Sequence, residues 1–178
     1  MEELQHTAKA YYDAAAENAK QVARDFVAEM DHDRDGVVCL PEFLRFAKVK
    51  GYVRMSNPHF FRQLNTSCTG KLSFDEAITF FYIVTSARPL CDGCGHLVLG
   101  IFFTCVKCFD DADESGTFNL CTGCFSRSKY VHSHEHFLDN VVLLHAKRRE
   151  LKQERNKGFC LAAIEVACRL ATRFCTIM

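Results

Sequence analysis

The chain has 178 residues, with 22 basic and 22 acidic side chains and a formal net charge of zero. Balanced charge provides no long-range attraction for nucleic acid, so we expect no nucleic-acid partner. The 11 cysteines are an odd number, and several form Cys-x2-Cys pairs. That usage indicates metal-binding thiols in a reduced, cytoplasmic protein rather than a secreted disulfide framework. The first residues have neither a basic start nor an apolar run, so no signal peptide is expected.

An acidic loop of twelve residues, 31–42, follows an N-terminal helical lead at 1–16 and a helical segment with apolar residues at Ala23, Phe26, Val27 and Met30. Ca²⁺ takes six to eight oxygen ligands, and carboxylates that alternate along a loop around a glycine supply them. The predicted calcium ligands are Asp31, Asp33, Asp35, the backbone carbonyl of Val37, and Glu42.

A second loop at 65–76 keeps the glycine and the closing glutamate but has lost the other carboxylates. Its candidate ligands are Asn65, Ser67, Thr69, the carbonyl of Lys71, and Glu76. Calcium affinity in such loops follows ligand charge, so this loop is predicted to be a structural partner of the first, with weak calcium binding as the alternative. Val38 and Leu72, at equivalent positions, are expected to pair as a short two-stranded contact.

On these two loops, residues 17–86 resemble the EF-hand family. The resemblance implies a pair of helix–loop–helix units with one strong calcium site and one degenerate loop. Whether the pair is a sensor or a buffer is left open, because its phenylalanines suit either an apolar groove or a core.

A short linker at 87–90 leads to a ladder of paired ligands. The ladder reads Cys-x2-Cys three times and ends in a His-x-His pair, and its members are Cys91, Cys94, Cys105, Cys108, Cys121, Cys124, His134 and His136. Eight sulfur and nitrogen ligands suit two tetrahedral zinc sites. Sites with four protein ligands and no open position are structural, so the ladder predicts a binding module rather than an enzyme.

This ladder, together with the Phe-Asn-Leu-Cys step at 118–121, makes residues 91–138 resemble a ZZ-type zinc finger. The resemblance implies a cross-brace in which alternate pairs share an ion. Carried over, Cys91, Cys94, Cys121 and Cys124 hold one Zn²⁺, and Cys105, Cys108, His134 and His136 hold the other. His132 competes with His134 as a ligand, because the run at 132–136 offers three imidazoles.

ZZ fingers recognise free protein N-termini and short peptide tails, and the resemblance implies a similar partner here. A cationic α-amino group needs carboxylates around it. Asp92 and Asp110 match the pocket positions of that family, whereas Asn119 stands where a further aspartate is common. A finger that serves only as a scaffold is the alternative.

The last segment, 139–178, combines a basic run at 147–157 with an amphipathic helix at 159–174. It ends in Cys175-Thr176-Ile177-Met178, a C-a-a-X box that predicts prenylation of Cys175. One prenyl chain anchors a protein only marginally, so the basic run or palmitoylation of Cys160 or Cys168 would supply the second membrane signal. The alternative is a free C-terminal cysteine, and a nuclear location is left open.

The sequence therefore predicts a mainly α EF-hand pair, a small zinc-stabilised cross-brace finger of the ZZ type, and a C-terminal amphipathic helix. The predicted function is a calcium- and zinc-binding adaptor that recognises protein partners and is gated by calcium. Two alternatives are a ubiquitin-transfer component, whose finger recruits a conjugating enzyme, and a passive calcium buffer with a structural finger.

Overall fold

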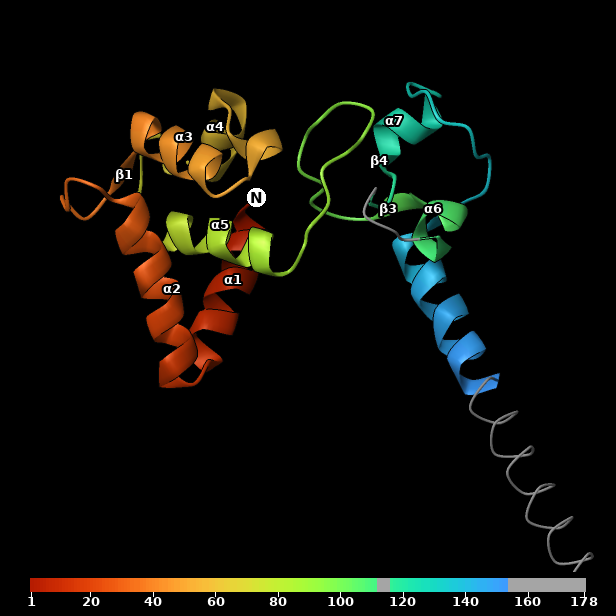
Figure 1. Ribbon diagram of the computed structural model, residues 1–178, viewed down its shortest axis with the longest axis horizontal. Helices are drawn as coiled ribbons and strands as arrows, with labels where there is room; N and C mark the ends of the chain where they lie inside the picture. The colour runs from red at the N-terminus through yellow and green to blue at the C-terminus, as the bar shows by residue number, and fades with distance from the viewer. Residues whose placement is uncertain (112–115, 154–178) are drawn as a thin grey trace, which may run out of the picture. The chain divides into compact units, whose positions relative to one another are not determined.

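The structure is a computed structural model and describes residues 1–111 and 116–153 (Figure 1). Its described residues divide into two compact units, one of residues 1–100 with 119–131 and one of residues 101–111, 116–118 and 132–153. The predicted amphipathic helix at 159–174 and the prenylation box at Cys175 lie outside the described residues. In the described ranges, no helix has the length and apolar character needed to cross a bilayer.

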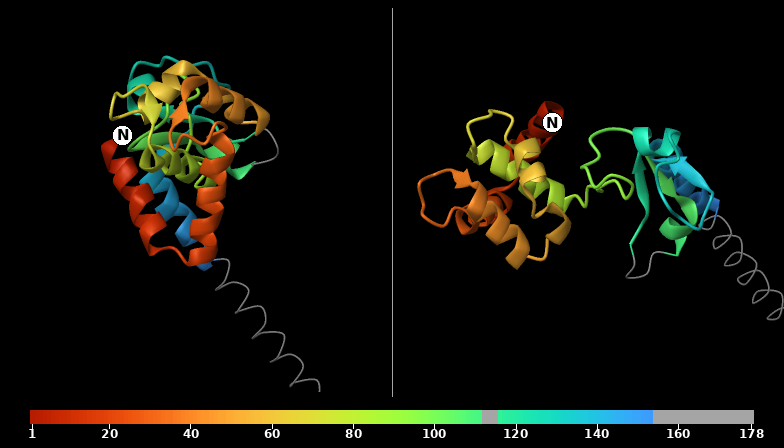
Figure 2. Two further views of the ribbon diagram at one scale, coloured as in Figure 1. Left: turned by 90° about the vertical axis from the view of Figure 1, so that its left-hand side faces the viewer. Right: turned by 90° about the horizontal axis from the view of Figure 1, so that it is seen from above.

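Five α-helices and a short 3₁₀ helix form most of the first unit. They are α1 (Glu2–Ala14), α2 (Glu17–Met30), α3 (Leu40–Val49), η1 (Val53–Met55), α4 (Pro58–Leu64) and α5 (Phe74–Thr85). The helices α1 and α2 diverge from a short turn, and α5 packs against both of them (Figures 1 and 2). The predicted lead at 1–16 is thus a helix, and α2 to α5 make two successive helix–loop–helix units.

Capping side chains and a proline fix the residues at which these helices begin. Asn57 caps α4 by accepting a hydrogen bond from the backbone N–H of Phe60 at 2.9 Å, and Pro58 follows in the first turn. At α5, Ser73 and Glu76 form a reciprocal capping box. Glu42 makes the same return contact at the start of α3, where its carboxylate accepts from the Cys39 N–H at 2.9 Å.

The strands β1 (Val38–Cys39) and β2 (Lys71–Leu72) pair antiparallel, with Val38 opposite Leu72 and Cys39 opposite Lys71. The predicted contact between Val38 and Leu72 is therefore confirmed. Both side chains are fully buried, so they join the two loops to the core beneath them.

Aromatic side chains fill the centre of the helical unit. The ring of Phe43 lies 5.0 Å from that of Phe80 and 5.6 Å from that of Phe61, while Phe26 packs edge-on against Phe46 at 4.9 Å. Such pairs stabilise a core beyond the area that they bury. These residues, considered above for an exposed groove, form a packed core in this structure, with Phe26 partly buried at its margin.

The start of the finger packs on the same core. Leu90 and Leu97 are 6% and 5% exposed, belong to the buried cluster of the helices, and face each other in an isolated β-bridge. The backbone N–H of Arg88 donates to the Ile83 carbonyl, and that of Val98 donates to the Pro89 carbonyl. The segment expected as a linker at 87–90 is therefore anchored to the helical core.

The remaining elements are short. In the first unit, β4 (Asn119–Cys121) leads into α7 (Thr122–Ser126). In the second unit, β3 (Phe102–Cys105) continues into α6 (Val106–Asp110) and pairs antiparallel with β5 (Phe137–Asp139), with Cys105 opposite Phe137. A further helix begins at residue 140 and continues to 153, the last described residue.

Candidate metal centres

The first cluster of thiols lies in the first unit and consists of Cys91, Cys94, Cys121 and Cys124. Their sulfur atoms all lie within 4.8 Å of one another, and the Cys94 and Cys121 sulfurs are 4.0 Å apart. In a tetrahedral site with Zn–S bonds of about 2.3 Å, neighbouring sulfurs are about 3.8 Å apart. The spacing therefore suits one Zn²⁺ ion.

The environment of this cluster favours ionisation of one thiol and opposes that of another. Burial opposes ionisation of Cys91, but backbone N–H groups of Cys121, Cys94 and Gly93 outweigh it and lower the pKa of Cys91 to about 7. Burial and the neighbouring thiols raise the pKa of Cys124 to about 12. Four thiolates need a cation among them to be stable together, which a bound metal supplies as the protons leave.

Gly93 sits in the tight turn between the first two cysteines. A Cβ atom at this position would lie 2.8 Å from the Lys129 carbonyl oxygen and 3.0 Å from the Cys124 sulfur. The backbone and the ligand sulfur both approach the turn too closely for a side chain. Glycine is thus required here by the geometry of the thiol cluster.

The second cluster lies in the second unit and consists of Cys105, Cys108, His132 and His134. His134 Nδ1 is 3.5 Å from the Cys105 sulfur and 3.4 Å from the Cys108 sulfur, and His132 Nε2 is 3.4 Å from the Cys108 sulfur. The sulfur–nitrogen edge of a tetrahedral zinc site is about 3.6 Å. This set therefore also suits Zn²⁺.

The structure differs from the expected ligand pair at the last position. The imidazole of His132, the competing candidate, lies in the cluster. The imidazole of His136 is exposed and does not belong to the cluster of four ligands in the described residues. His132 stacks on Phe118 with ring centroids 4.0 Å apart and meets the edge of Phe137 at 5.7 Å. The cluster thus takes two of the three histidines in this run, and aromatic packing favours His132 over His136.

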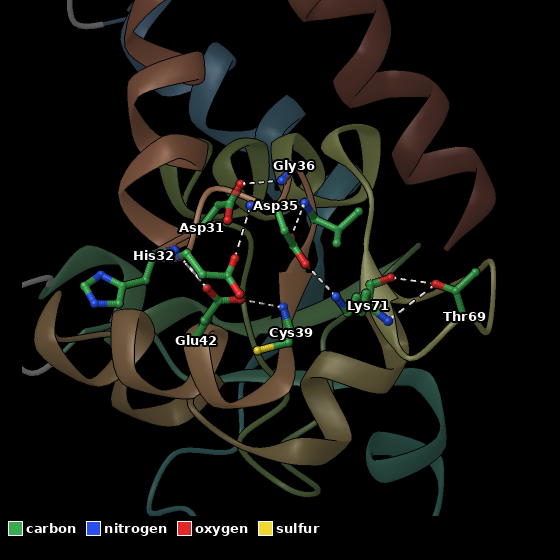
Figure 3. A network of polar contacts seen from close by, with 10 residues as sticks. Asp31, His32, Asp35, Gly36, Cys39, Glu42, Thr69 and Lys71 are labelled. Atoms are coloured by element: carbon green, nitrogen blue, oxygen red, sulfur yellow. Dashed lines mark hydrogen bonds and ion pairs between the residues drawn. The ribbon is translucent and has the colours of Figure 1, made fainter.

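The acidic loop of the first hand holds its carboxylates close together. The ligand oxygens of Asp31, Asp33 and Asp35 lie within 4.8 Å of one another. The Gly36 N–H donates to Asp31 at 2.9 Å, and the Val37 N–H donates to Asp35 at 3.0 Å (Figure 3). Gly36 has a φ of +86°, a left-handed conformation that glycine adopts without strain.

Two observations show that this loop is suited to a cation. Within the described part of the chain, Asp31 Oδ1 is buried and lacks a hydrogen-bond partner, a costly state for a carboxylate oxygen. Glu42 closes the loop by accepting from the N–H groups of His32 at 2.8 Å and Cys39 at 2.9 Å (Figure 3). Burial opposes ionisation of Glu42, but these hydrogen bonds lower its pKa to about 2, so it is a carboxylate at neutral pH.

The second loop has the same backbone course but closes on its own side chains. The Asn65 amide accepts from the Gly70 N–H at 3.1 Å, as Asp31 does from Gly36, and donates to the Lys71 carbonyl at 2.5 Å. Thr69 Oγ1 also donates to that carbonyl, at 2.7 Å. The oxygens that would bind a metal are thus already bonded to N–H and O–H donors of the loop.

Lys71 connects the two loops. Its ammonium group lies 2.6 Å from Asp35 Oδ2, so the second loop contributes a positive charge to the acidic cluster of the first (Figure 3). The hydrogen bond lowers the pKa of Asp35 and raises that of Lys71. This ion pair was not expected from the sequence, although the predicted pairing of Val38 with Leu72 already placed Lys71 beside the first loop.

The two carboxylates expected to bind a peptide are each paired with a basic side chain. Asp92 Oδ2 accepts from the Asn119 N–H at 2.6 Å, and Asp92 Oδ1 lies 3.0 Å from the Arg54 guanidinium. In the second unit, Asp110 pairs with Lys147 of the helix that begins at residue 140. Arg54 and Lys147 were not identified from the sequence, because nothing local to either residue marks its distant partner.

Comparison with protein-family models finds one match, to "Zinc finger, ZZ type", over residues 86–136. The match does not reach the loops at 31–42 and 65–76, so their resemblance to EF-hands stays a prediction. Searches of curated proteins and of solved structures each found no match. The family match and the two clusters of thiols and imidazoles together identify residues 86–136 as similar to the ZZ-type zinc fingers, which are zinc-binding protein-interaction modules.

Proposed function

We propose that this chain is an adaptor whose ZZ-type finger, held together by two Zn²⁺ ions, binds the cationic amino terminus of a protein partner, and whose helical unit binds one Ca²⁺ ion. The observation that carries the proposal is the carboxylate of Asp92. It lies between the first two zinc-ligand cysteines, is held by the backbone of β4, and already faces a cation. A carboxylate that is held in place and already lies beside a cation can accept a charged hydrogen bond from an ammonium group.

The ligand sets favour a role in binding rather than catalysis. Each cluster has four sulfur or nitrogen ligands, which completes a tetrahedral zinc site. A catalytic zinc keeps one position for water or substrate. In each unit the ions would therefore fix the short elements around them and so shape the surface that carries Asp92 or Asp110.

The helical unit would hold Ca²⁺ through Asp31, Asp33, Asp35, the Val37 carbonyl and Glu42. The buried, unsatisfied Asp31 Oδ1 supports this assignment, since a bound cation would satisfy it. Calcium would supply the positive charge that three neighbouring carboxylates need. Glu42 lies in the first turn of α3, so its engagement would bias the position of that helix.

A lipid on Cys175 would add a tether to a membrane surface, in keeping with a cytoplasmic adaptor. Mass spectrometry of the chain expressed in cells that carry prenyltransferases would test this part. A mass increase at the C-terminal peptide, lost in Cys175→Ser, is the expected result.

The metal content is tested first. Mass spectrometry of the native protein should find two zinc ions, with one lost in Cys91→Ser and one lost in Cys108→Ser. His132→Ala and His136→Ala form a matched pair, and we expect a weakened second site only for His132→Ala. Retention of both ions in His132→Ala, with loss in His136→Ala, would instead restore the ligand pair expected from the sequence.

Partner recognition is tested with the zinc-loaded chain and a library of peptides with free or acetylated amino termini. We expect binding of free termini only, and loss of binding in Asp92→Asn. Asp25→Asn, which changes an exposed carboxylate on α2, is the control and should bind as the wild type does. Equal binding of free and acetylated peptides would contradict the assignment of Asp92.

A further inference from the structure

Arg54 and Asp92 join the helical part of the first unit to the finger. Arg54 lies in η1, between α3 and α4, and its Nη2 atom is 3.0 Å from Asp92 Oδ1. The Asp92 side chain is 19% exposed, whereas that of Arg54 is 59% exposed. Oδ1 of Asp92, the oxygen that does not bond to the Asn119 N–H, is therefore paired with a basic side chain from outside the finger.

Neighbouring contacts hold the start of the finger against the helices that carry Arg54. The rings of His59 and His96 meet edge to face with centroids 4.4 Å apart, and Leu90 and Leu97 are buried in the core of the helices. The other Asp92 oxygen is occupied by the Asn119 N–H. Arg54 therefore approaches a carboxylate whose other oxygen is already bonded, and a cationic group from a partner would meet the positive charge of Arg54 at Oδ1.

We propose that Arg54 is an internal ligand of the finger, which competes with the amino terminus of a partner for Asp92. This inference rests on the proposed function, because it assumes that Asp92 receives the cationic group. Oδ1 can accept more than one hydrogen bond, but two cationic groups at the same oxygen repel each other, so Arg54 and the ammonium group of a partner compete for it. Arg54 thus lowers the affinity of the finger for every partner that binds in this way.

The position of Arg54 also connects the competition to the acidic loop. Glu42 is in the first turn of α3, and η1 follows the end of that helix after Gly51, whose φ is +83°. A shift of α3 on calcium binding would be passed to Arg54 through this short connection. Calcium would then release Asp92 by displacing its internal ligand rather than by any contact with the finger.

The test compares Arg54→Ala with the wild type for binding of a peptide with a free amino terminus, in the zinc-loaded full chain. An exposed ion pair contributes up to about 1 kcal/mol, so its removal should tighten binding by about two- to fivefold. Arg54→Lys keeps the charge and should stay near the wild type. Arg62→Ala removes an exposed arginine from α4 and should change nothing.

The outcomes separate the two proposals. Unchanged or weaker binding in Arg54→Ala overturns the role of Arg54 and leaves peptide recognition intact. Absence of binding in every variant, with two zinc ions present, overturns the proposed function and this inference with it. If Arg54→Ala tightens binding, calcium should raise the affinity of the wild type and leave that of Arg54→Ala unchanged; an equal calcium effect on both would contradict the connection through α3.

Discussion

The loops at 31–42 and 65–76 share a backbone course but differ in what fills their centres. Both place a non-glycine residue and a glycine in the left-handed region at equivalent positions, Arg34 with Gly36 and Cys68 with Gly70. In the second loop the Asn65 amide donates to the Lys71 carbonyl, so the loop satisfies its own oxygens. In the first loop the corresponding Asp31 cannot donate, and one of its oxygens remains buried and unsatisfied within the described residues.

The comparison shows that one framework closes on itself when its first side chain carries hydrogen-bond donors, and keeps a carboxylate oxygen unsatisfied when that side chain carries none. A neutral amide has N–H groups that take the place of a metal. Carboxylates only accept, and their mutual repulsion favours the loop with a cation in place. In addition, Lys71 of the second loop places one positive charge beside Asp35 of the first loop.

The largest effect should come from the closing glutamates. Glu42→Gln should weaken calcium binding by more than about 100-fold, because it removes a charge and a bidentate ligand. Glu76→Gln is the matched change in the other loop and should leave the affinity of the first site within about threefold. Calorimetric titration of the zinc-loaded protein measures both. Comparable losses in the two variants would show that the loops bind as equals.

The second loop should become a calcium site when its donors are replaced. In the triple variant Asn65→Asp, Ser67→Asp, Thr69→Asp, the amide that closes the loop is lost and three carboxylates are added. We expect the calcium stoichiometry to rise from one to two ions per chain in equilibrium dialysis. A stoichiometry that stays at one would mean that the backbone of this loop, rather than its side chains, prevents binding.

Acid should act on the first loop through Glu42. Its pKa in the folded protein is about 2, below the ordinary value of 4.5, so its hydrogen bonds stabilise the fold above about pH 4.5 and this contribution is lost as the pH falls towards 2. After allowance for solvent screening, the contribution is about 2 kcal/mol. Chemical unfolding at pH 6 and pH 3 should show a smaller pH dependence in Glu42→Gln than in the wild type. Identical pH dependence in the two proteins would show that Glu42 does not contribute to the loss of stability in acid.

The smallest effect should come from Lys71. Replacing it with methionine keeps the length of the side chain and removes the charge beside Asp35, so calcium affinity should rise by about fivefold. Lys48→Met, on α3, is the control for a general change in net charge. The gain should shrink at high salt, because screening weakens the repulsion between Lys71 and the ion. A fall in affinity would show that Lys71 holds the loops in register instead.

Much of the helical unit could be predicted from local patterns. The apolar spacing before the first loop indicated a helix, and Val38 opposite Leu72 followed from equal positions in two loops. The ligand spacing likewise indicated two clusters of four. These features depend on residues that are close in sequence or repeat at fixed intervals, so local chemistry is enough to specify them.

The sequence by itself determined the ligand chemistry, namely six paired cysteines followed by histidines, and an acidic loop beside a neutral one. The tertiary structure decided which atoms meet. His132 rather than His136 joins the second cluster, because it packs against Phe118. Leu90 and Leu97 are buried in the helical core. Arg54 pairs with Asp92, and Lys71 pairs with Asp35. Apart from the anchoring of Leu90 and Leu97, these outcomes depend on single side chains from distant segments, whose approach is fixed by packing and carries no periodic signal in the chain.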